Sequence, residues 1–201
     1  MKKLYISFLL LISMPVCMMA QDISHLTLQY STGVGVGSTA DYVSQMSFRG
    51  FSLDYKNFGI SDKVAVGFDL GWNTFFQDKD YASYTSKDGE TTVTGKQYRY
   101  INTFPMLATA DYFFQNSDSY IRPFAGLGVG TIHSIKTLDM GLYTWESTDW
   151  HFGLKPQAGV WVGFDDATKL TLSAEYLYGF KTKDVSELQY LTFNLGFVFI
   201  P

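Results

Sequence analysis

Residues 188–200 read LQYLTFNLGFVFI, and large apolar side chains alternate with small or polar ones along this segment. The apolar set is Leu191, Phe193, Leu195, Phe197 and Phe199, and the opposite set is Thr192, Asn194 and Gly196. Successive side chains of a β-strand point to opposite faces. The segment is therefore predicted to be a strand with one apolar face and one polar face.

The same alternation recurs along the chain, whereas helical periodicity is absent. The predicted strands are Leu26–Ser38, Ser47–Phe58, Lys63–Phe76, Gln97–Phe114, Tyr120–Ile135, His151–Phe164, Lys169–Phe180 and Leu188–Ile200. No apolar run after residue 20 approaches the roughly 20 residues that a membrane-spanning helix needs. A composition of 17% aromatic residues, 18 glycines and 5 prolines also indicates an all-β chain.

Short and long connections alternate between these segments. The short ones are 59–62, 115–119 and 165–168, and the long ones are 39–46, 77–96, 136–150 and 181–187. In an antiparallel up-and-down arrangement of eight strands, all short turns then lie at one end, beside both termini. Transmembrane β-barrels of the outer membrane have this layout.

Two barrels of opposite orientation fit the alternation. A water-soluble, lipocalin-like barrel would enclose its apolar face around a ligand, and a membrane barrel would turn that face toward lipid. Nine glycines lie on the more polar face: Gly33, Gly35, Gly37, Gly126, Gly128, Gly130, Gly159, Gly163 and Gly196. A narrow lumen has room mainly for small side chains, whereas a water-facing surface would carry more Lys and Glu. The sequence therefore favours a transmembrane barrel with a polar lumen.

Aromatic residues gather near the two ends of the predicted strands, as the interfacial girdles of membrane barrels do. The set expected near the long loops is Trp72, Phe76, Trp150, Phe152, Phe180 and Tyr190. The set expected near the short turns is Phe58, Tyr112, Phe114, Tyr120 and Phe164.

Eight charged residues are expected on the inward face. They are Asp54, Lys56, Asp69, Arg99, Asp111, Arg122, Lys155 and Glu175, four basic and four acidic. The favoured interpretation is a neutral network of ion pairs and hydrogen bonds that plugs the lumen. A polar conduit or proton path is the alternative.

The first 20 residues have the layout of a secretory signal peptide. Met1-Lys2-Lys3 is positive, Leu4 to Met14 is almost wholly apolar, and Ala20 offers a small residue for cleavage. Residues 21–201 would then form one exported barrel domain. The formal charge of the whole chain is −4, which speaks against a nucleic-acid partner. A single cysteine, Cys17, excludes an internal disulfide.

Three segments carry a resemblance to a known family. They are 121–130 (IRPFAGLGVG), 156–164 (PQAGVWVGF) and 195–199 (LGFVF). The chain resembles small outer-membrane β-barrel proteins of the kind found in Bacteroidetes, similar in architecture to the OmpA and OmpX barrels. This resemblance implies residence in the outer membrane of a Gram-negative bacterium, among its lipid and lipopolysaccharide. It also implies insertion by the barrel assembly machinery.

Two features depart from that pattern. Many such barrels end on an aromatic residue, whereas this chain ends Phe199-Ile200-Pro201. Pro105 and Pro123, together with Pro156, fall within predicted strands, where each removes a hydrogen-bond donor from the ladder. A bulge or local break is expected at these prolines, and Pro105 is expected to divide its strand.

Catalytic residues can be matched only to short motifs. The segments 78–80 (Asp-Lys-Asp) and 149–151 (Asp-Trp-His) are similar to the carboxylate and histidine motifs of omptin proteases. The adjacent His133 and Ser134 offer the residue types of a lipid-A deacylase, but neighbours in a strand point to opposite faces. The chain is therefore expected not to be an enzyme and to use no metal or cofactor.

The long loops are the remaining candidates for function. Tyr81, Tyr84, Tyr143 and Trp145 stand among acidic residues there, and such side chains suit contact with an extracellular protein or glycan. The expected function is a structural or surface-interaction role. A small porin-like channel for ions or solutes is the alternative, and a barrel that assists secretion machinery is a third.

Overall fold

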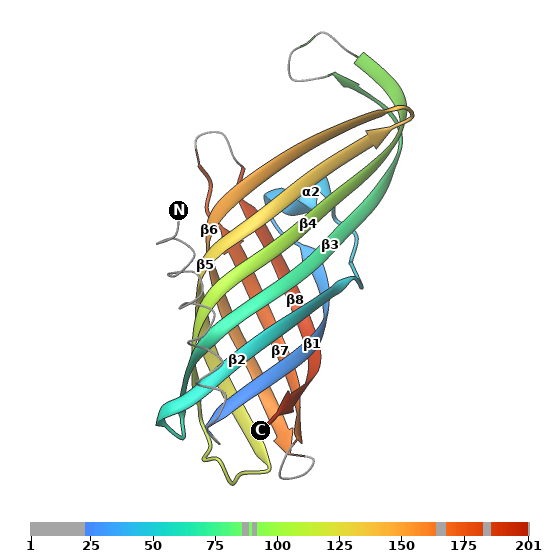
Figure 1. Cartoon of the computed structure of the whole chain (residues 1–201). Coiled ribbons are helices and arrows are strands. Elements are labelled where there is room, and N and C mark those ends of the chain that lie inside the picture. The colour runs from blue at the N-terminus through green and yellow to red at the C-terminus, as the bar shows by residue number, and fades with distance from the viewer. Residues whose placement is uncertain (1–22, 86–88, 90–91, 164–167, 183–185, 201) are drawn as a thin grey trace, which may run out of the picture.

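The computed structural model describes residues 23–85, 89, 92–163, 168–182 and 186–200. Eight antiparallel strands follow one another around a closed ring, and β1 pairs with β8 to close it (Figure 1). Their bounds are β1 Ser24–Gly35, β2 Gly50–Ser61, β3 Val64–Thr85, β4 Thr92–Phe113, β5 Ile121–Met140, β6 Tyr143–Gly163, β7 Thr168–Gly179 and β8 Leu188–Phe199. The predicted fold class is confirmed. The signal peptide predicted for residues 1–20 lies outside the described residues.

Short connections gather at one end of the barrel, called here the turn end. The β2–β3 and β4–β5 connections lie there, as do the end of β6 and the start of β7, beside the start of β1 and the end of β8 (Figure 1). The opposite, outer end carries the β3–β4 and β5–β6 hairpins. This arrangement confirms the separation that the alternating connection lengths predict.

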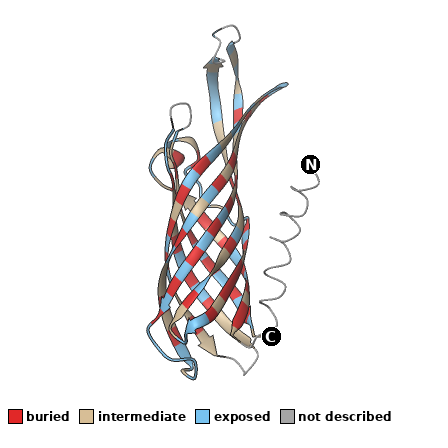
Figure 2. Ribbon diagram, turned by 60° about the vertical axis from the view of Figure 1, so that its left-hand side comes forward, coloured by how far each residue is buried: buried red, intermediate tan, exposed pale blue. Residues whose placement is uncertain are grey.

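Two segments predicted as long loops are mostly strand. β3 continues to Thr85 and β4 begins at Thr92, while β5 continues to Met140 and β6 begins at Tyr143. These hairpins rise well beyond the other strands (Figure 2). Most side chains on the β3–β4 tip are exposed or half-buried. With no apolar face to bury there, the sequence carries no alternation by which the strands could be recognised.

A short helix, α2 (Ser38–Tyr42), lies in the connection between β1 and β2, where the sequence shows no helical pattern. Five residues are too few to display a helical period. The helix is tied to the outer end because the backbone N–H of Gln189 donates to the Thr39 hydroxyl at 2.8 Å. The Tyr42 hydroxyl also donates to the Thr137 carbonyl at 3.0 Å. None of the described segments forms a helix that is long and apolar enough to cross a membrane.

The apolar face of the sheet points outward and the polar face points inward. On β1, Thr27 and Gln29 are 1% and 4% exposed, whereas Leu28 and Tyr30 are 52% and 51% exposed. Phe193 on β8 is likewise 52% exposed. A lipocalin-like barrel would have the opposite orientation, with its apolar face inside. The soluble alternative is therefore wrong about which face points inward.

Inside the barrel, two apolar clusters bracket a polar layer. The outer cluster consists of Val43, Phe75, Ile101, Leu107, Ile132, Leu177, Leu188 and Tyr190. The turn-end cluster consists of Phe58, Ala65, Phe113, Phe124, Trp161 and Val198. Neither cluster is predicted from the sequence, because the inward side chains are expected to be polar or small.

The predicted aromatic girdles are correct in part. Trp150, Phe152 and Phe180 are exposed toward the outer end, and Tyr112, Phe114 and Tyr120 are exposed toward the turn end. Trp72 and Phe76 are half-buried, and Phe164 lies outside the described residues. Tyr190 and Phe58 are buried inside, so their assignment to the girdles is wrong. Tyr190 shares the inward parity of Thr192, and Phe58 shares that of Lys56.

Two of the three strand prolines interrupt a ladder without shifting its register. Residues 71–72 of β3 and 104–105 of β4 are not paired with one another at Pro105, yet β4 is continuous through this proline. A similar gap flanks Pro156 in the β6–β7 ladder. The expectation that Pro105 divides its strand is therefore wrong. Pro123 keeps its pairing with Val160, and the register shifts of the β2–β3 and β3–β4 ladders lie elsewhere, at 57–61 and 79–82.

Candidate functional site

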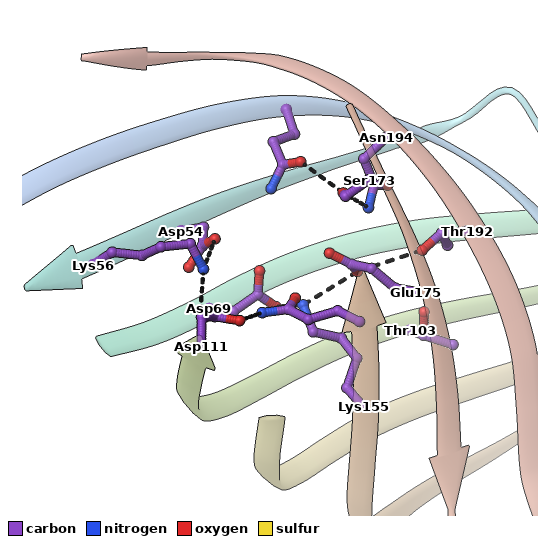
Figure 3. Close-up of polar contacts among 12 residues, drawn as sticks. Asp54, Lys56, Asp69, Thr103, Asp111, Lys155, Ser173, Glu175, Thr192 and Asn194 are labelled. Atoms are coloured by element: carbon purple, nitrogen blue, oxygen red, sulfur yellow. Dashed lines mark hydrogen bonds and ion pairs between the residues drawn. The ribbon is translucent and has the colours of Figure 1, made fainter. Parts of the chain in front are cut away.

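The polar layer is organised around two buried lysines, each of which contacts two carboxylates (Figure 3). Lys56 Nζ lies 2.8 Å from Asp54 Oδ2 and also contacts Asp111 Oδ2. Lys155 Nζ lies 3.0 Å from Asp69 Oδ1 and 3.2 Å from Glu175 Oε2. All six side chains belong to the set that the sequence predicts to face inward, and the structure brings them together.

Backbone register places these charges. Asp54 on β2 is directly paired with Asp69 on β3, so their side chains share the inward face. Asp111 on β4 is paired with Gly126 on β5, and a Cβ at that glycine would lie 1.8 Å from Asp111 Oδ1. Absence of a side chain at position 126 therefore makes room for the carboxylate.

Neutral side chains complete part of the network. The Gln157 side-chain amide donates to Asp111 Oδ1, and the Thr192 hydroxyl donates to Glu175 Oε2 at 3.4 Å. The Asn194 amide donates to the Ser173 hydroxyl at 3.1 Å. The first contact connects β6 to β4 across the lumen, and the other two connect the neighbouring strands β7 and β8.

The two arginines of the predicted set lie apart from this network. Arg122 is at the turn end, where its guanidinium lies 4.6 Å from the Phe113 ring centroid and donates to the Asp62 carbonyl at 2.6 Å. Arg99 is at the outer end, 4.9 Å from the Tyr42 ring centroid. The central network therefore has two basic and four acidic residues, not the balance expected from the sequence.

A serine–histidine contact that the sequence analysis does not identify joins β5 to β6. Ser134 Oγ lies 3.0 Å from His151 Nε2, and His151 Nδ1 lies 3.3 Å from the Phe180 carbonyl. Ser134 and His151 are 0% and 2% exposed, so the hydroxyl is shielded from any external substrate. His133 faces away from Ser134 and packs against Trp150 at 4.6 Å between ring centroids. Adjacent residues thus point to opposite faces, as predicted.

The omptin-like motifs are engaged with other partners. Asp78 pairs with Lys96 at 2.9 Å, and His151 is bonded to Ser134. On this protruding part of the hairpin, the hydrogen bond from Lys96 holds the pKa of Asp78 below its usual range. Within the described ranges, no group of three or more His, Cys, Asp or Glu side chains could hold a metal ion.

Three of the four aromatic residues proposed for loop contacts form one cluster on the outer hairpins. The Trp145 ring centroid lies 4.9 Å from that of Tyr84 and 5.8 Å from that of Tyr143. Tyr81 is 81% exposed and lines a shallow groove of about 390 Å³ with Tyr143. These residues project from extended strands, not from loops.

Solved structures show the same architecture. Neisserial surface protein A superposes with a TM-score of 0.57 and 16% identity over 89% of this chain and 97% of the other. Ail, the attachment invasion locus protein and an outer membrane protein of Yersinia pestis, gives a TM-score of 0.51 and 13% identity over 88% and 96%. No family model and no curated protein matches the sequence. The chain therefore has the fold of small outer-membrane β-barrels, an antiparallel up-and-down ring of eight strands.

Proposed function

We propose that this chain is an outer-membrane barrel with a filled lumen that binds a protein partner through its protruding outer sheet. The observation that carries the proposal is the pair of hairpins, β3–β4 and β5–β6, which rise together beyond the rest of the ring (Figure 2). Export by residues 1–20, a Bacteroidetes-type origin and insertion by the barrel assembly machinery belong to the same proposal.

The outward face supports placement in a membrane. Leu70, Val129, Leu172 and Leu195 are each at least 40% exposed along the middle of their strands. Ring closure also matters, because lipid offers no hydrogen bonds and only a closed barrel satisfies the backbone groups of every strand. The two observations favour hydrocarbon as the solvent of this face, with outer-membrane lipid and lipopolysaccharide as neighbours.

Open edges of the protruding sheet support a protein partner. Toward the outer end of the barrel, the β2–β3 ladder stops at the pair Gly50–Asn73. Beyond this pair, β3 continues to Thr85, and among the described residues no strand pairs with the edge of β3 that faces away from β4. The β6–β7 ladder ends at Gly153–Gly179, and the described chain supplies no further strand beside 143–152. An extended segment of another protein can add to such an edge through main-chain hydrogen bonds.

The aromatic cluster gives this surface a side-chain anchor. Tyr143, Trp145 and Tyr84 lie on adjacent parts of the two hairpins, and tyrosine and tryptophan are the residues that most often contribute binding energy at protein interfaces. A glycan partner would use the same aromatic faces but would make no use of the open strand edges.

Filling of the lumen argues against the porin-like alternative. A conducting path would have to pass both apolar clusters, whose members include Phe113 and Phe75 at 0% exposure. We expect no stable single-channel current in planar bilayers. Nothing in the described structure favours the secretion-assisting role.

The decisive variant shortens both hairpins at paired residues. Gln77 is paired with Arg99, and Thr137 with Glu146, so an Asn-Gly turn can join each pair without changing the register of the barrel. We expect this variant to fold and insert while cells displaying it lose adhesion to surfaces coated with extracellular matrix proteins.

A double substitution, Tyr143→Ala with Trp145→Ala, provides a milder test that leaves both strands in place. It should reduce the same adhesion, whereas Tyr112→Ala at the turn end should not. Unchanged adhesion by the correctly folded, shortened barrel would contradict the proposal. Retained binding to proteins stripped of their glycans would distinguish a protein partner from a glycan.

A further inference from the structure

Thr27, Asp54 and Asp69 lie side by side on three consecutive strands. Thr27 on β1 is paired with Asp54 on β2, and Asp54 is paired with Asp69 on β3. The three residues are 1%, 4% and 1% exposed, and all face the lumen. Directly opposed residues on one face of an antiparallel pair have Cβ atoms about 5 Å apart. The three side chains therefore form a continuous row, called here the oxygen row.

Each member of the oxygen row has an oxygen without a hydrogen-bond partner. These atoms are Thr27 Oγ1, Asp54 Oδ1 and Asp69 Oδ2. The other oxygen of each carboxylate is already taken by a lysine, since Asp54 Oδ2 contacts Lys56 and Asp69 Oδ1 contacts Lys155. Buried polar atoms are normally satisfied, and leaving a charged one without a partner is costly. Three such atoms in one row would all gain a partner from a single ligand placed among them.

Charge specifies the class of that ligand. The network holds two ammonium groups against four carboxylates, a formal excess of two negative charges within the enclosed layer. Asp54 and Asp69 carry like charges directly opposite one another, which is destabilising by itself. A water molecule would supply hydrogen bonds but would leave this repulsion uncompensated. A cation would supply a partner for the oxygens and would also compensate the repulsion between the two carboxylates.

We propose that the oxygen row binds one small monovalent cation of the sodium class. Carboxylate and hydroxyl oxygens are hard ligands that suit hard cations. A singly charged ion placed between Asp54 and Asp69 would offset their mutual repulsion and half of the formal excess of two negative charges in the network. The site lies on the inward face of β1, β2 and β3, and Figure 3 shows its two carboxylates, Asp54 and Asp69. It is independent of the proposed contact at the outer surface.

The test compares sodium chloride with choline chloride at equal ionic strength. The mature chain is refolded from urea into detergent micelles in each salt, and the thermal midpoint is followed by circular dichroism. Because a ligand that binds only the folded state stabilises it by mass action, the midpoint should rise with the logarithm of sodium concentration. Choline is too large for the row and should give no such rise.

Substitutions locate the effect. Thr27→Val removes one ligand oxygen and leaves every ion pair in place, and Asp69→Asn removes the negative charge of a second ligand. Both variants should lose the sodium-dependent rise. Glu175→Gln is the matched control, because it also removes one carboxylate from Lys155 but does not belong to the row. It should keep the rise.

Three results would overturn the proposal. The wild-type midpoint could be the same in both salts, or it could respond to pH but not to sodium, which would identify the compensating species as a proton. If Glu175→Gln and Thr27→Val lost the sodium-dependent rise to the same extent, sodium would be compensating the charge of the whole network and not binding at one site. Should Asp69→Asn fail to fold, Thr27→Val alone decides between these outcomes.

Discussion

The ammonium of Lys155 on β6 lies 3.0 Å from the carboxylate of Asp69 on β3, and this contact spans the lumen between strands that are not neighbours in the ring. The same ammonium holds Glu175 on β7 at 3.2 Å. Lys155 therefore connects two walls of the barrel through buried charges. Removing one partner of such a pair costs more than the pair itself contributes, because an uncompensated charge remains.

Lys155→Met should strongly destabilise the barrel, since it leaves two buried carboxylates without their ammonium while keeping the side-chain volume. We expect the free energy of unfolding to fall by about 3–5 kcal/mol, measured by urea denaturation in lipid vesicles. Lys96→Met is the matched control, because Lys96 pairs with Asp78 on the exposed hairpin. That change should leave the unfolding free energy almost unaltered. An equal loss of unfolding free energy in both variants would contradict the expectation that the buried ion pairs contribute more to stability than the exposed pair.

Gly126→Ala tests the packing around Asp111, the carboxylate partner of Lys56. A Cβ at position 126 would lie 1.8 Å from Asp111 Oδ1 and 2.7 Å from the Ala110 carbonyl, so Asp111 would have to move away from Lys56. Overpacking of this kind costs about 1–3 kcal/mol. Gly95→Ala, on the protruding part of β4, meets nothing within 4 Å and should be tolerated. The urea midpoints of both variants in detergent micelles measure the difference. An unchanged midpoint in Gly126→Ala would show that the network accommodates a displaced Asp111.

Strand existence and facing could be predicted from the sequence because the apolar outward face and the polar lumen impose opposite polarities on alternate residues. The two extended hairpins could not, because most side chains on both faces of the β3–β4 tip are exposed or half-buried and neither polarity is imposed. Asp78 to Thr85 thus has the composition of a loop although it forms strand. The protruding sheet on which the proposed function rests is therefore visible only in the structure.

Parity also identifies which charges face inward, but it does not identify their partners. Lys56 and Asp111 meet because of the stagger between strands, a property of ring closure that no local pattern records. The same stagger sends Arg122 and Arg99 to opposite ends. Tyr190 is the complementary case, because its position near a strand end suggests a girdle residue although it shares the inward parity of Thr192 and is buried.

Docking of α2 should depend on pH through Tyr42. Burial raises the pKa of Tyr42 to about 12, because partial removal from water disfavours the charged phenolate. The neutral hydroxyl donates to the Thr137 carbonyl. A raised pKa stabilises the folded state below the unfolded value, about 10 for tyrosine, and that contribution is lost as pH rises through the folded value. The contact should therefore weaken between about pH 10 and pH 12. A tyrosine-specific carbon NMR signal that is absent in Tyr42→Phe should titrate in this range. Titration near the ordinary value would contradict the burial of the Tyr42 hydroxyl.

Leu195→Arg tests which solvent bathes the outward face. Leu195 is 49% exposed near the middle of β8, and an arginine at the midplane of a bilayer costs about 2–4 kcal/mol. We expect a loss of this size in the free energy of unfolding when the variant is measured in phospholipid vesicles. Leu142→Arg places the same charge at a fully exposed residue on the tip of the β5–β6 hairpin, and water there solvates it at little cost. A loss at position 195 that is no larger than the loss at position 142 would mean that water, not hydrocarbon, surrounds the barrel wall.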